Sequence, residues 1–445
     1  MPKTLIRGCT LLDPSQRLYA PMSILIAGRT IEAVHPVISA ERADRVIEAG
    51  GLVAAPGFVD IHVHLRQPGG EGSETIRSGT DAAARGGFTT VYAMPNTNPV
   101  CDSSVVVRYV IDRAEEAGSV RVVPIGAVTL GQKGEDLVDF GALLQSGAGA
   151  FSDDGRPVAN AEVMRRALEC CRDLGAVIFD HCEDMNLTGD GVMHEGAVSF
   201  RLGLKGIPRL SESTLVARDS ALALATGGRL HICHVSNKDS VHAIRSMKRH
   251  GAPVTAEVSP HHLTLTHEAV ESIDAGPGSF STSAKMKPPL CAEEDRQVLI
   301  EALTDGTIDC IATDHAPHSP ASKDTTFEDA PFGIVGLESA FPVLYNEFVA
   351  TGKWTLDFLV EKMTAAPARV VNQPWGTLKP GGSADIVLLD LSGTTEFSAD
   401  HLGSKSRNSP WLGRTFKSRI AATFAQGTCV FADPSRFPKG ASAAG

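Results

Sequence analysis

The sequence lacks several features that would assign it to a membrane or to nucleic acid. It contains no uninterrupted apolar run of about 18 residues, which a membrane-spanning helix would need. Its first residues, MPKTLIRGCTLLDPSQ, have no apolar stretch of the kind found in signal peptides. Positive charge is not in excess, because the formal net charge is −11. We therefore expect neither a membrane nor a nucleic acid as partner, although local cations could still bind a small anionic substrate.

Closely spaced cysteine pairs are also absent. The nine cysteines are scattered, their number is odd, and none forms a CxxC motif. This pattern predicts reduced thiols and a cytoplasmic protein. The 445 residues, of which 42% are hydrophobic, are enough for a large core and exceed one average domain.

The middle of the chain, residues 56–375, alternates between short apolar segments and longer amphipathic ones. The segments typical of strands are 89–94, 120–129, 176–181, 229–236, 253–259 and 307–315. The segments typical of helices are 103–117, 160–174, 213–226, 238–250 and 293–304. Repeated strand–helix units predict a parallel sheet, and this number of units predicts an α/β fold of the (β/α)8 TIM-barrel type.

The two ends of the chain differ from the middle, because they consist of short β-like pieces without intervening helices. These pieces include TLIRGCTLL and SILIAGRTIEAV near the start, and GGSADIVLLDL and RIAATFAQGTCVFA near the end. We expect residues 1–55 and 376–437 to pair into one small β-sandwich domain beside the barrel. That domain is then discontinuous in sequence.

The stretch IHVHLR, residues 61–66, places polar side chains at alternate positions directly after an apolar segment. In a strand, His62, His64 and Arg66 share one face. Such a face is unsuited to a hydrophobic core. It suits a metal ion with an anion bound beside it.

Other polar residues follow other predicted strands, at the barrel end where active sites are built. A single histidine in such a place is more often a hydrogen-bonded structural residue, but the joint occurrence favours a metal site. Imidazole and carboxylate groups suit zinc and similar divalent ions. These residues are His62 and His64, Asp153 and Asp154, His181, His234, and Asp314 with His315 and His318, and we expect six ligands among them, four histidines and two aspartates. We expect His261 and His262, in SPHHL, to have a structural or supporting role.

The motifs that carry these residues resemble a known family. They are HVHLR after GFVD, GFTTVYAMPNTNP, FSDDG, HCED, CHVS, AEVSPHHL, TIDCIATDHAPH and APFGIVGLE. Together they resemble the amidohydrolase superfamily and, more closely, the class I dihydroorotases of bacterial type. HxHxR alone is a signal of the superfamily, whereas MPNT, DHAPH and APFGI in this order are more specific. The resemblance covers nearly the whole chain.

The resemblance implies roles for individual residues. His62, His64 and Asp314 would hold one zinc ion, His181 and His234 a second, and Asp153 would bridge the two. Arg66, Asn96 and His318 match substrate-binding positions, and Phe332 with Gly333 matches a segment that meets the pyrimidine ring. Asp314 matches the catalytic acid/base.

The implied reaction is the reversible hydrolysis of dihydroorotate to N-carbamoyl-L-aspartate in pyrimidine biosynthesis. Two metal ions, or one tight and one weak ion, would generate the attacking hydroxide. Asp314 would pass its proton to the leaving ring nitrogen. The planar guanidinium of Arg66 would clamp the substrate carboxylate. A homodimer, or an assembly with aspartate transcarbamoylase, is a further expectation from the resemblance.

Two other functions fit the same scaffold. Hydantoinase-like and allantoinase-like relatives usually carry a carboxylated lysine as bridging ligand, but no lysine lies between Lys133 and Lys205. Some dihydroorotase-like chains have lost ligands and act as scaffolds for aspartate transcarbamoylase, but all six ligand positions are intact here. The first alternative is another cyclic-amide hydrolase, and the second is a catalytically silent scaffold.

Two segments near the implied site leave questions open. In KMKPPL the family commonly has Asn before the two prolines, whereas this chain has Lys287, which we left out of the predicted site. The stretch 315–331 is rich in small and polar residues, which is typical of a rim loop that closes over substrate. An ordinary exposed loop is the alternative for its middle part, 320–330.

Overall fold

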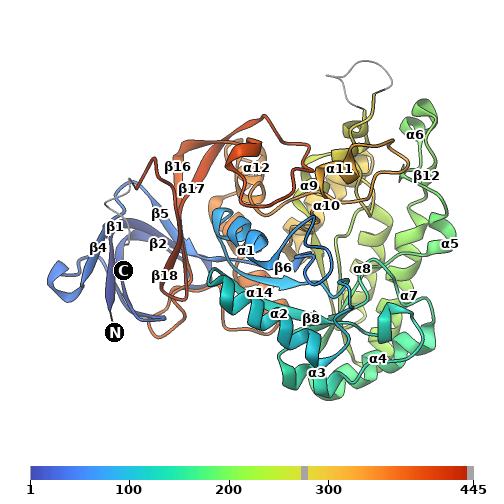
Figure 1. The fold of residues 1–445 in the computed structure, drawn as a ribbon, viewed down its shortest axis with the longest axis horizontal. Helices are drawn as coiled ribbons and strands as arrows, with labels where there is room; N and C mark the ends of the chain where they lie inside the picture. Colours follow the sequence, from blue (N-terminus) through green and yellow to red (C-terminus); the bar gives the residue numbers. More distant parts are fainter. Residues whose placement is uncertain (1, 272–278, 438–445) are drawn as a thin grey trace.

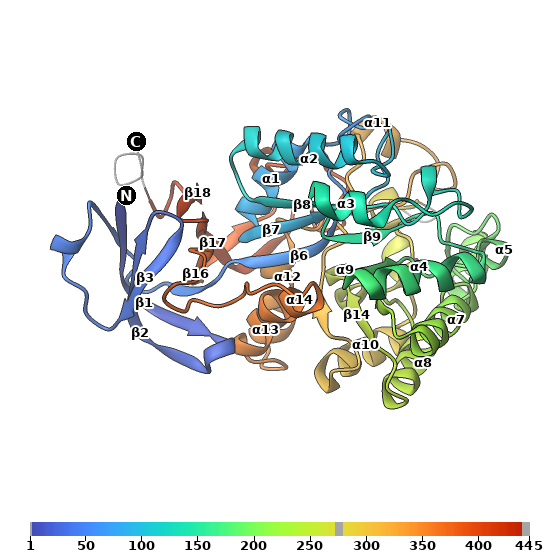
Figure 2. The ribbon, with the colours of Figure 1, turned by 90° about the horizontal axis from the view of Figure 1, so that it is seen from below.

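The structure is a computed structural model that describes residues 2–271 and 279–437. Two sheets organise these residues: a parallel sheet rolled into a barrel, and a mixed sheet built from both ends of the chain. Figure 1 shows the mixed sheet, in blue and red, on one side of the barrel. Figure 2 shows the same division from below, with the barrel helices at the other end of the molecule.

The barrel consists of eight strands that pair in parallel, in the order β15-β14-β13-β10-β9-β8-β7-β6. Their bounds are β6 (Phe58–Val63), β7 (Phe88–Ala93), β8 (Arg121–Gly126), β9 (Ala150–Ser152), β10 (Val177–Asp180), β13 (Arg229–Ile232), β14 (Val254–Val258) and β15 (Cys310–Ile311). A parallel bridge between Val63 and His315 joins the chain after β15 to β6. This contact closes the barrel, so the predicted (β/α)8 fold is confirmed.

Helices follow the barrel strands and cover them from outside. The longer ones are α1 (Ile76–Arg85), α2 (Ser104–Ala117), α3 (Phe140–Ser146), α4 (Ala161–Leu174), α7 (Leu210–Thr226), α8 (Lys238–Arg249), α10 (Glu293–Asp305) and α13 (Leu356–Met363). The five predicted helices match α2, α4, α7, α8 and α10, although α7 begins three residues earlier than predicted. Gly175 and Gly227 end α4 and α7 with left-handed backbone angles, which glycine adopts without strain.

Short elements complete the barrel and its rim. They are α5 (Met185–Thr188), β11 (Met193–His194), α6 (Ala197–Leu202), β12 (Gly206–Ile207), α9 (Pro260–Thr264), α11 (Pro320–Lys323), α12 (Ala340–Leu344) and α14 (Ala365–Val370). Residues of α14, including Ala366 and Val370, pack with Ile61, Tyr92 and Phe179 in one buried cluster. The barrel interior is therefore largely apolar, with His231 and Glu257 as buried polar residues on β13 and β14. Other polar residues gather at the strands' C-terminal ends.

The second sheet joins the two ends of the chain in the order β18-β17-β16-β5-β1-β2-β3, with β4 beside β1. Its strands are β1 (Lys3–Asp13), β2 (Leu18–Ala27), β3 (Thr30–His35), β4 (Arg45–Glu48), β5 (Val53–Pro56), β16 (Ile386–Glu396), β17 (Thr415–Ala425) and β18 (Thr428–Ala432). Strand β5 pairs with β1 on one side and with β16 on the other, so it connects the two ends. Residues from both ends share one apolar cluster, as expected for the small β domain.

Residues 397–414, between β16 and β17, leave this sheet and contact the barrel rim. Asn408 in this segment hydrogen-bonds to the loops that follow β15. We propose that the barrel and the β domain divide at 55/56 and 375/376. In that division residues 397–414 belong to the β domain, although they contact the barrel.

The helices and the cysteines bear on the expectations about membranes and disulfides. No helix within residues 2–271 and 279–437 is both long enough and apolar enough to cross a membrane. All nine cysteines are free thiols, and Cys170 is the exposed one.

Candidate active site

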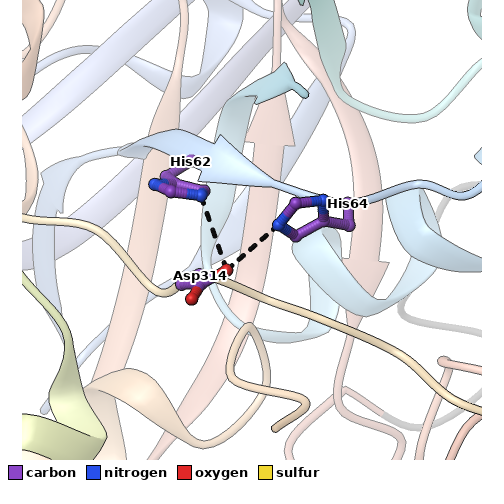
Figure 3. Close-up of side chains that lie close together, drawn as sticks. All are labelled: His62, His64 and Asp314. Carbon is purple, nitrogen blue, oxygen red and sulfur yellow. Dashed lines mark hydrogen bonds and ion pairs between the residues drawn. The ribbon is translucent and has the colours of Figure 1, made fainter. Parts of the chain in front are cut away.

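His62, His64 and Asp314 meet at the C-terminal end of the barrel, as Figure 3 shows. Nε2 of His62 lies 3.5 Å from Oδ1 of Asp314, and Nε2 of His64 lies 3.1 Å from the same oxygen. All three side chains are buried. These atoms lie close enough together to hold one metal ion.

A second group lies beside the first, and it is centred on Asp154. Oδ1 of Asp154 is 3.5 Å from Nε2 of His62, 3.4 Å from Nδ1 of His181 and 3.8 Å from Nε2 of His234. Its Oδ2 is 3.5 Å from Nε2 of His64. The two histidines of this group face each other, with Nδ1 of His181 2.8 Å from Nε2 of His234. Asp154 therefore touches both groups.

The prediction that Asp153 lies at this bridging position is corrected by the geometry. Asp153 turns toward β8, where it accepts hydrogen bonds from the backbone N–H groups of Val128 and Thr129 and from the Thr129 hydroxyl. The reason is the alternation of side chains along β9. Ala150 packs inside the barrel and Phe151 outside it, so Asp154 continues the inner face and Asp153 the outer one. Burial raises the pKa of Asp153 to about 6.

Oxygen acceptors fix the orientation of three of the four histidines. His62 donates from Nδ1 to Glu257 (2.6 Å), His64 from Nδ1 to the Asn96 side-chain oxygen (2.9 Å), and His181 from Nε2 to Glu183 (3.1 Å). Burial opposes ionisation of Glu257, but the adjacent imidazoles of His62 and His231 hold its pKa at about 2. Each imidazole thus directs its unprotonated nitrogen into the site, as metal ligands require.

The residues present fit a divalent cation. Nε2 of His62 and Oδ1 of Asp154 are buried and have no hydrogen-bond partner among the described residues. Buried polar atoms are rarely left without partners, and here they point at one another across a space lined by nitrogen and oxygen donors. Burial opposes ionisation of Asp154, but His181, His234 and His62 keep its pKa well below the ordinary value. This donor set suits zinc and related metals.

Three residues of this site have strained backbone angles. Arg66, His234 and Asp314 have positive φ angles of 60°, 34° and 47°, which residues other than glycine seldom adopt. Each of these residues lies two or three residues after the end of its strand. Such strain is typical of residues whose position serves function rather than stability.

A cavity of about 170 Å³ opens above the two groups. The predicted residues that line it are His64, Arg66, Asn96, His181, His234, Asp314, His318, Phe332 and Gly333. Asp154 and Lys287, which lay outside the prediction, line it too. The barrel thus brings the predicted anion-binding residues and four of the six predicted ligands to one cavity.

Arg66 and His318 form one wall of this cavity. Arg66 donates from Nε to the carbonyl of Pro317 (3.1 Å), and its Nη2 lies 3.4 Å from Nε2 of His318. His318 donates from Nε2 to the carbonyl of Phe332 (2.7 Å). Burial, reinforced by Arg66, lowers the pKa of His318 to about 3, so this imidazole is neutral. His315 instead contacts Glu74 (3.4 Å) and the backbone N–H of Gly336 (3.2 Å), away from the cavity.

Asn408 braces the loops that carry this wall. Its amide donates to the carbonyls of Ala316 and Gly333 (both 2.9 Å), and its oxygen accepts from the backbone N–H of His318 (3.0 Å). The middle of the rim loop is anchored as well, because the buried Lys323 donates to the carbonyls of Thr282 and Pro331. Lys323, Phe327 and Ala330 are buried, whereas most other residues between 320 and 330 are exposed.

The predicted site does not include five residues that the structure places at or beside it: Asp154, Glu183, Glu257, Lys287 and Asn408. Strand alternation counted from Ala150 would have selected Asp154. Glu183 lies two residues after His181 in the HCED motif, which was a usable signal. Glu257 and Asn408 gave no signal, because their partners lie on distant parts of the chain.

Comparisons with known proteins agree with this geometry. The family model described as Dihydro-orotase-like matches residues 51–240. The dihydroorotase of Pelotomaculum thermopropionicum is 48% identical over 431 residues, which cover 97% of this chain and 99% of that protein. The dihydroorotase of Listeria monocytogenes is 49% identical over 384 residues, covering 86% and 88%.

Solved structures show the same architecture. An L-hydantoinase from Arthrobacter aurescens has a TM-score of 0.84 at 26% identity, covering 97% of this chain and 96% of that one. A dihydropyrimidinase from Brevibacillus agri has a TM-score of 0.80 at 24% identity, covering 97% and 95%, and shows the fold alone. The two dihydroorotases, at 48% and 49% identity along most of the chain, identify the family more specifically than the shared fold does. The chain belongs to the dihydroorotase family.

Proposed function

We propose that the chain is a dihydroorotase of pyrimidine biosynthesis, which opens the ring of dihydroorotate to N-carbamoyl-L-aspartate and closes it in reverse. The observation that carries this proposal is the cavity in which Arg66 lies beside four histidines and two aspartates. The substrate is a cyclic amide with one carboxylate. The cavity offers a cation for the carboxylate and a candidate metal centre for the amide.

The candidate metal centre would hold one or two zinc ions. His62, His64 and Asp314 would hold one ion, His181 and His234 the other, and Asp154 would contact both. When bound, zinc would supply the Lewis acidity that activates water and polarises the attacked carbonyl. Asn96, Glu183 and Glu257 would keep the imidazoles in the required tautomer.

Arg66 would bind the substrate carboxylate. Its bond to Pro317 fixes the plane of the guanidinium and leaves the Nη groups for a two-pronged contact. Asn96 holds His64 with its oxygen and Asp154 with one amide hydrogen, which leaves one hydrogen for substrate. The neutral His318 keeps Phe332 in place and complements this clamp. Phe332 and Gly333 would form the surface against which the ring lies.

Asp314 would move the proton during cleavage of the C–N bond. Burial opposes its ionisation, but His62 and His64 hold its pKa well below the ordinary value, so the group is an ionised carboxylate. It would take the proton of the attacking water and deliver it to the ring nitrogen as the C–N bond breaks and the new C–O bond forms. Reversal of these steps closes the ring.

The rival activities differ in the bridging group. The solved hydantoinases share the fold, yet a lysine bridge is excluded here because no lysine lies between Lys133 and Lys205. A silent scaffold would tolerate loss of ligands, whereas both ligand groups are present.

We further propose that the enzyme acts as a homodimer or in a complex with aspartate transcarbamoylase. Gel filtration of the chain alone and with that partner tests this assembly.

One experiment separates these functions. Purified protein is assayed for zinc per chain and then for ring opening of dihydroorotate, hydantoin and allantoin. We expect zinc together with selective turnover of dihydroorotate. Turnover of hydantoin or allantoin instead would replace the proposal with the cyclic-amide hydrolase alternative. Zinc without any turnover would support the scaffold.

A further inference from the structure

Lys287 connects the substrate cavity with a residue behind it. The side chain lines the cavity, and its Nζ lies 3.0 Å from Oε1 of Glu183. The lysine side chain is 22% exposed and the glutamate 6%, so the ion pair is largely shielded from water. Nζ also lies 5.3 Å from the centre of the Phe332 ring. Most lysines extend into solvent, whereas this one turns inward to a buried carboxylate.

Glu183 contacts both Lys287 and His181. Its Oε2 accepts the hydrogen bond from Nε2 of His181 (3.1 Å), and its Oε1 also accepts from the Thr188 hydroxyl (2.6 Å). The opposite nitrogen of His181 faces Asp154 and His234. An unbroken chain of polar contacts thus runs from the cavity wall through Lys287 and Glu183 to a candidate metal ligand.

The backbone around Lys287 is held on both sides. His262 lies between Ser259 and the carbonyl of Pro288, with nitrogen–oxygen distances of 3.1 Å to each. Lys285 donates to the carbonyls of Phe327 and Glu328. Because the residues beside it are fixed, Lys287 presents its ammonium group to Glu183 from a defined position.

We propose that Lys287 is a positioning residue for the metal centre, which acts on His181 through Glu183. This inference rests on the proposed function, because it assumes that His181 binds a metal ion. Two partners hold Oε1 of Glu183, and together they aim Oε2 at His181. Loss of the ammonium group leaves a buried carboxylate with less compensation, and its orientation toward the imidazole is then less restricted. An uncharged amide at position 287 could not form this ion pair.

The test is a double-mutant cycle with zinc as the probe. Apo-protein is prepared for the wild type, Lys287→Met, Glu183→Gln and the double variant, and zinc affinity is measured by competition with a chelating dye. We expect Lys287→Met and Glu183→Gln each to weaken zinc binding by about tenfold, the lower end of the range for groups that orient metal ligands. In the Glu183→Gln background, Lys287→Met should have little further effect.

Two controls distinguish positioning from general effects. Lys287→Arg retains a cation and should restore most of the zinc affinity. Lys205→Met removes a comparable ion pair with Asp190 (2.8 Å) on the exposed surface and should leave zinc binding and turnover unchanged. Circular dichroism and the melting temperature show whether each variant is folded.

Steady-state kinetics complete the test. Lys287→Met should lower kcat more than it raises KM for dihydroorotate. Unchanged zinc affinity together with a raised KM would overturn the inference and make Lys287 a direct substrate contact. An equally large effect of Lys287→Met in the Glu183→Gln background would overturn it too. Failure of the proposed function is distinguished from these results, because it would appear as absent turnover in the wild type.

Discussion

Asp153 and Asp154 are adjacent in sequence and lie on opposite faces of the barrel wall. One carboxylate ties β9 to the end of β8, and the other lies among the histidines. A sequence motif with two neighbouring carboxylates cannot by itself decide which of them binds a metal. The side chain that binds the metal is set by which residues of the three-residue strand β9 face inward. The packing of Ala150 inside the barrel and Phe151 outside it shows this orientation.

Exchanging each carboxylate for its amide separates the two roles. Asp154→Asn should lose most of the bound zinc, because the amide offers one weak oxygen ligand in place of a carboxylate that faces both ion positions. Asp153→Asn should retain zinc and lower the free energy of unfolding by about 1–3 kcal/mol. Zinc per chain after dialysis and urea unfolding provide the two measurements. Loss of zinc from Asp153→Asn alone would contradict our assignment.

Arg66 offers a second prediction for a single residue. Arg66→Lys keeps the charge but removes the planar pair of donors and the bond to Pro317. We expect KM for dihydroorotate to rise about tenfold or more, the equivalent of roughly 1.4 kcal/mol. Arg77→Lys on the exposed side of α1 serves as the control. An unchanged KM would show that another group binds the carboxylate.

Gly333 is required because its neighbours leave no room for a side chain. A Cβ atom there would lie 2.6 Å from the carbonyl oxygen of Ala316 and 2.8 Å from Nε2 of His318, and φ is +150°. Gly333→Ala should therefore displace His318 and lower kcat/KM by about a hundredfold, the cost of a shift of about 1 Å. Gly352→Ala, with φ of +78° but no atom within 4 Å, carries only backbone strain. Equal kinetics of the two variants would refute the steric argument.

At the scale of elements, regular patterns were predictable and long-range contacts were not. The helices α2, α4, α8 and α10 follow apolar periodicity and glycine or polar end signals, so their bounds agree closely with the prediction. Segment 307–315 was predicted as one strand, yet β15 covers only Cys310–Ile311. Asp314, three residues after the end of β15, has a positive φ, which a continuous strand to residue 315 would not allow.

The segment 397–414 is the clearest element that sequence patterns missed. Its Asn408 acts on loops about 75 to 92 residues earlier in the chain, and no periodicity links such positions. Asn408→Ala would leave the backbone groups of Ala316, His318 and Gly333 without these partners. We expect a loss of at least about 3 kcal/mol in unfolding free energy, since three groups lose their partner and each buried unsatisfied group costs about 1–3 kcal/mol.

The Asn408→Ala variant should also lose activity, since its loops carry the cavity wall. Urea unfolding and kcat/KM are measured on the same preparation. Asn372→Ala provides a comparison at an exposed asparagine with a φ of +53°. Full activity with reduced stability would show that Asn408 only supports the fold and does not shape the cavity.

At the scale of the whole molecule, the candidate metal centre connects barrel strands that are far apart in sequence. Its ligands come from β6 and from the segments that follow β6, β9, β10, β13 and β15. Zinc that binds only the folded state adds about 2.7 kcal/mol of stability at a free concentration one hundred times Kd. Calorimetry should therefore show a lower melting temperature after chelation, restored by zinc. A melting temperature independent of zinc would contradict the proposed centre.

The pairing of β5 with both β1 and β16 has a consequence for biosynthesis. About 330 residues separate β5 from β16, and ribosomes add about 5–20 residues per second. One edge of β5 thus stays unpaired for roughly 15 to 65 seconds, until its partner strand β16 is synthesised, judged from that rate. During this time the nascent chain exposes an unpaired strand edge with the alanines of VAAP, which invites wrong pairing. A chain of this topology can complete its second sheet only after β16 to β18 have been synthesised.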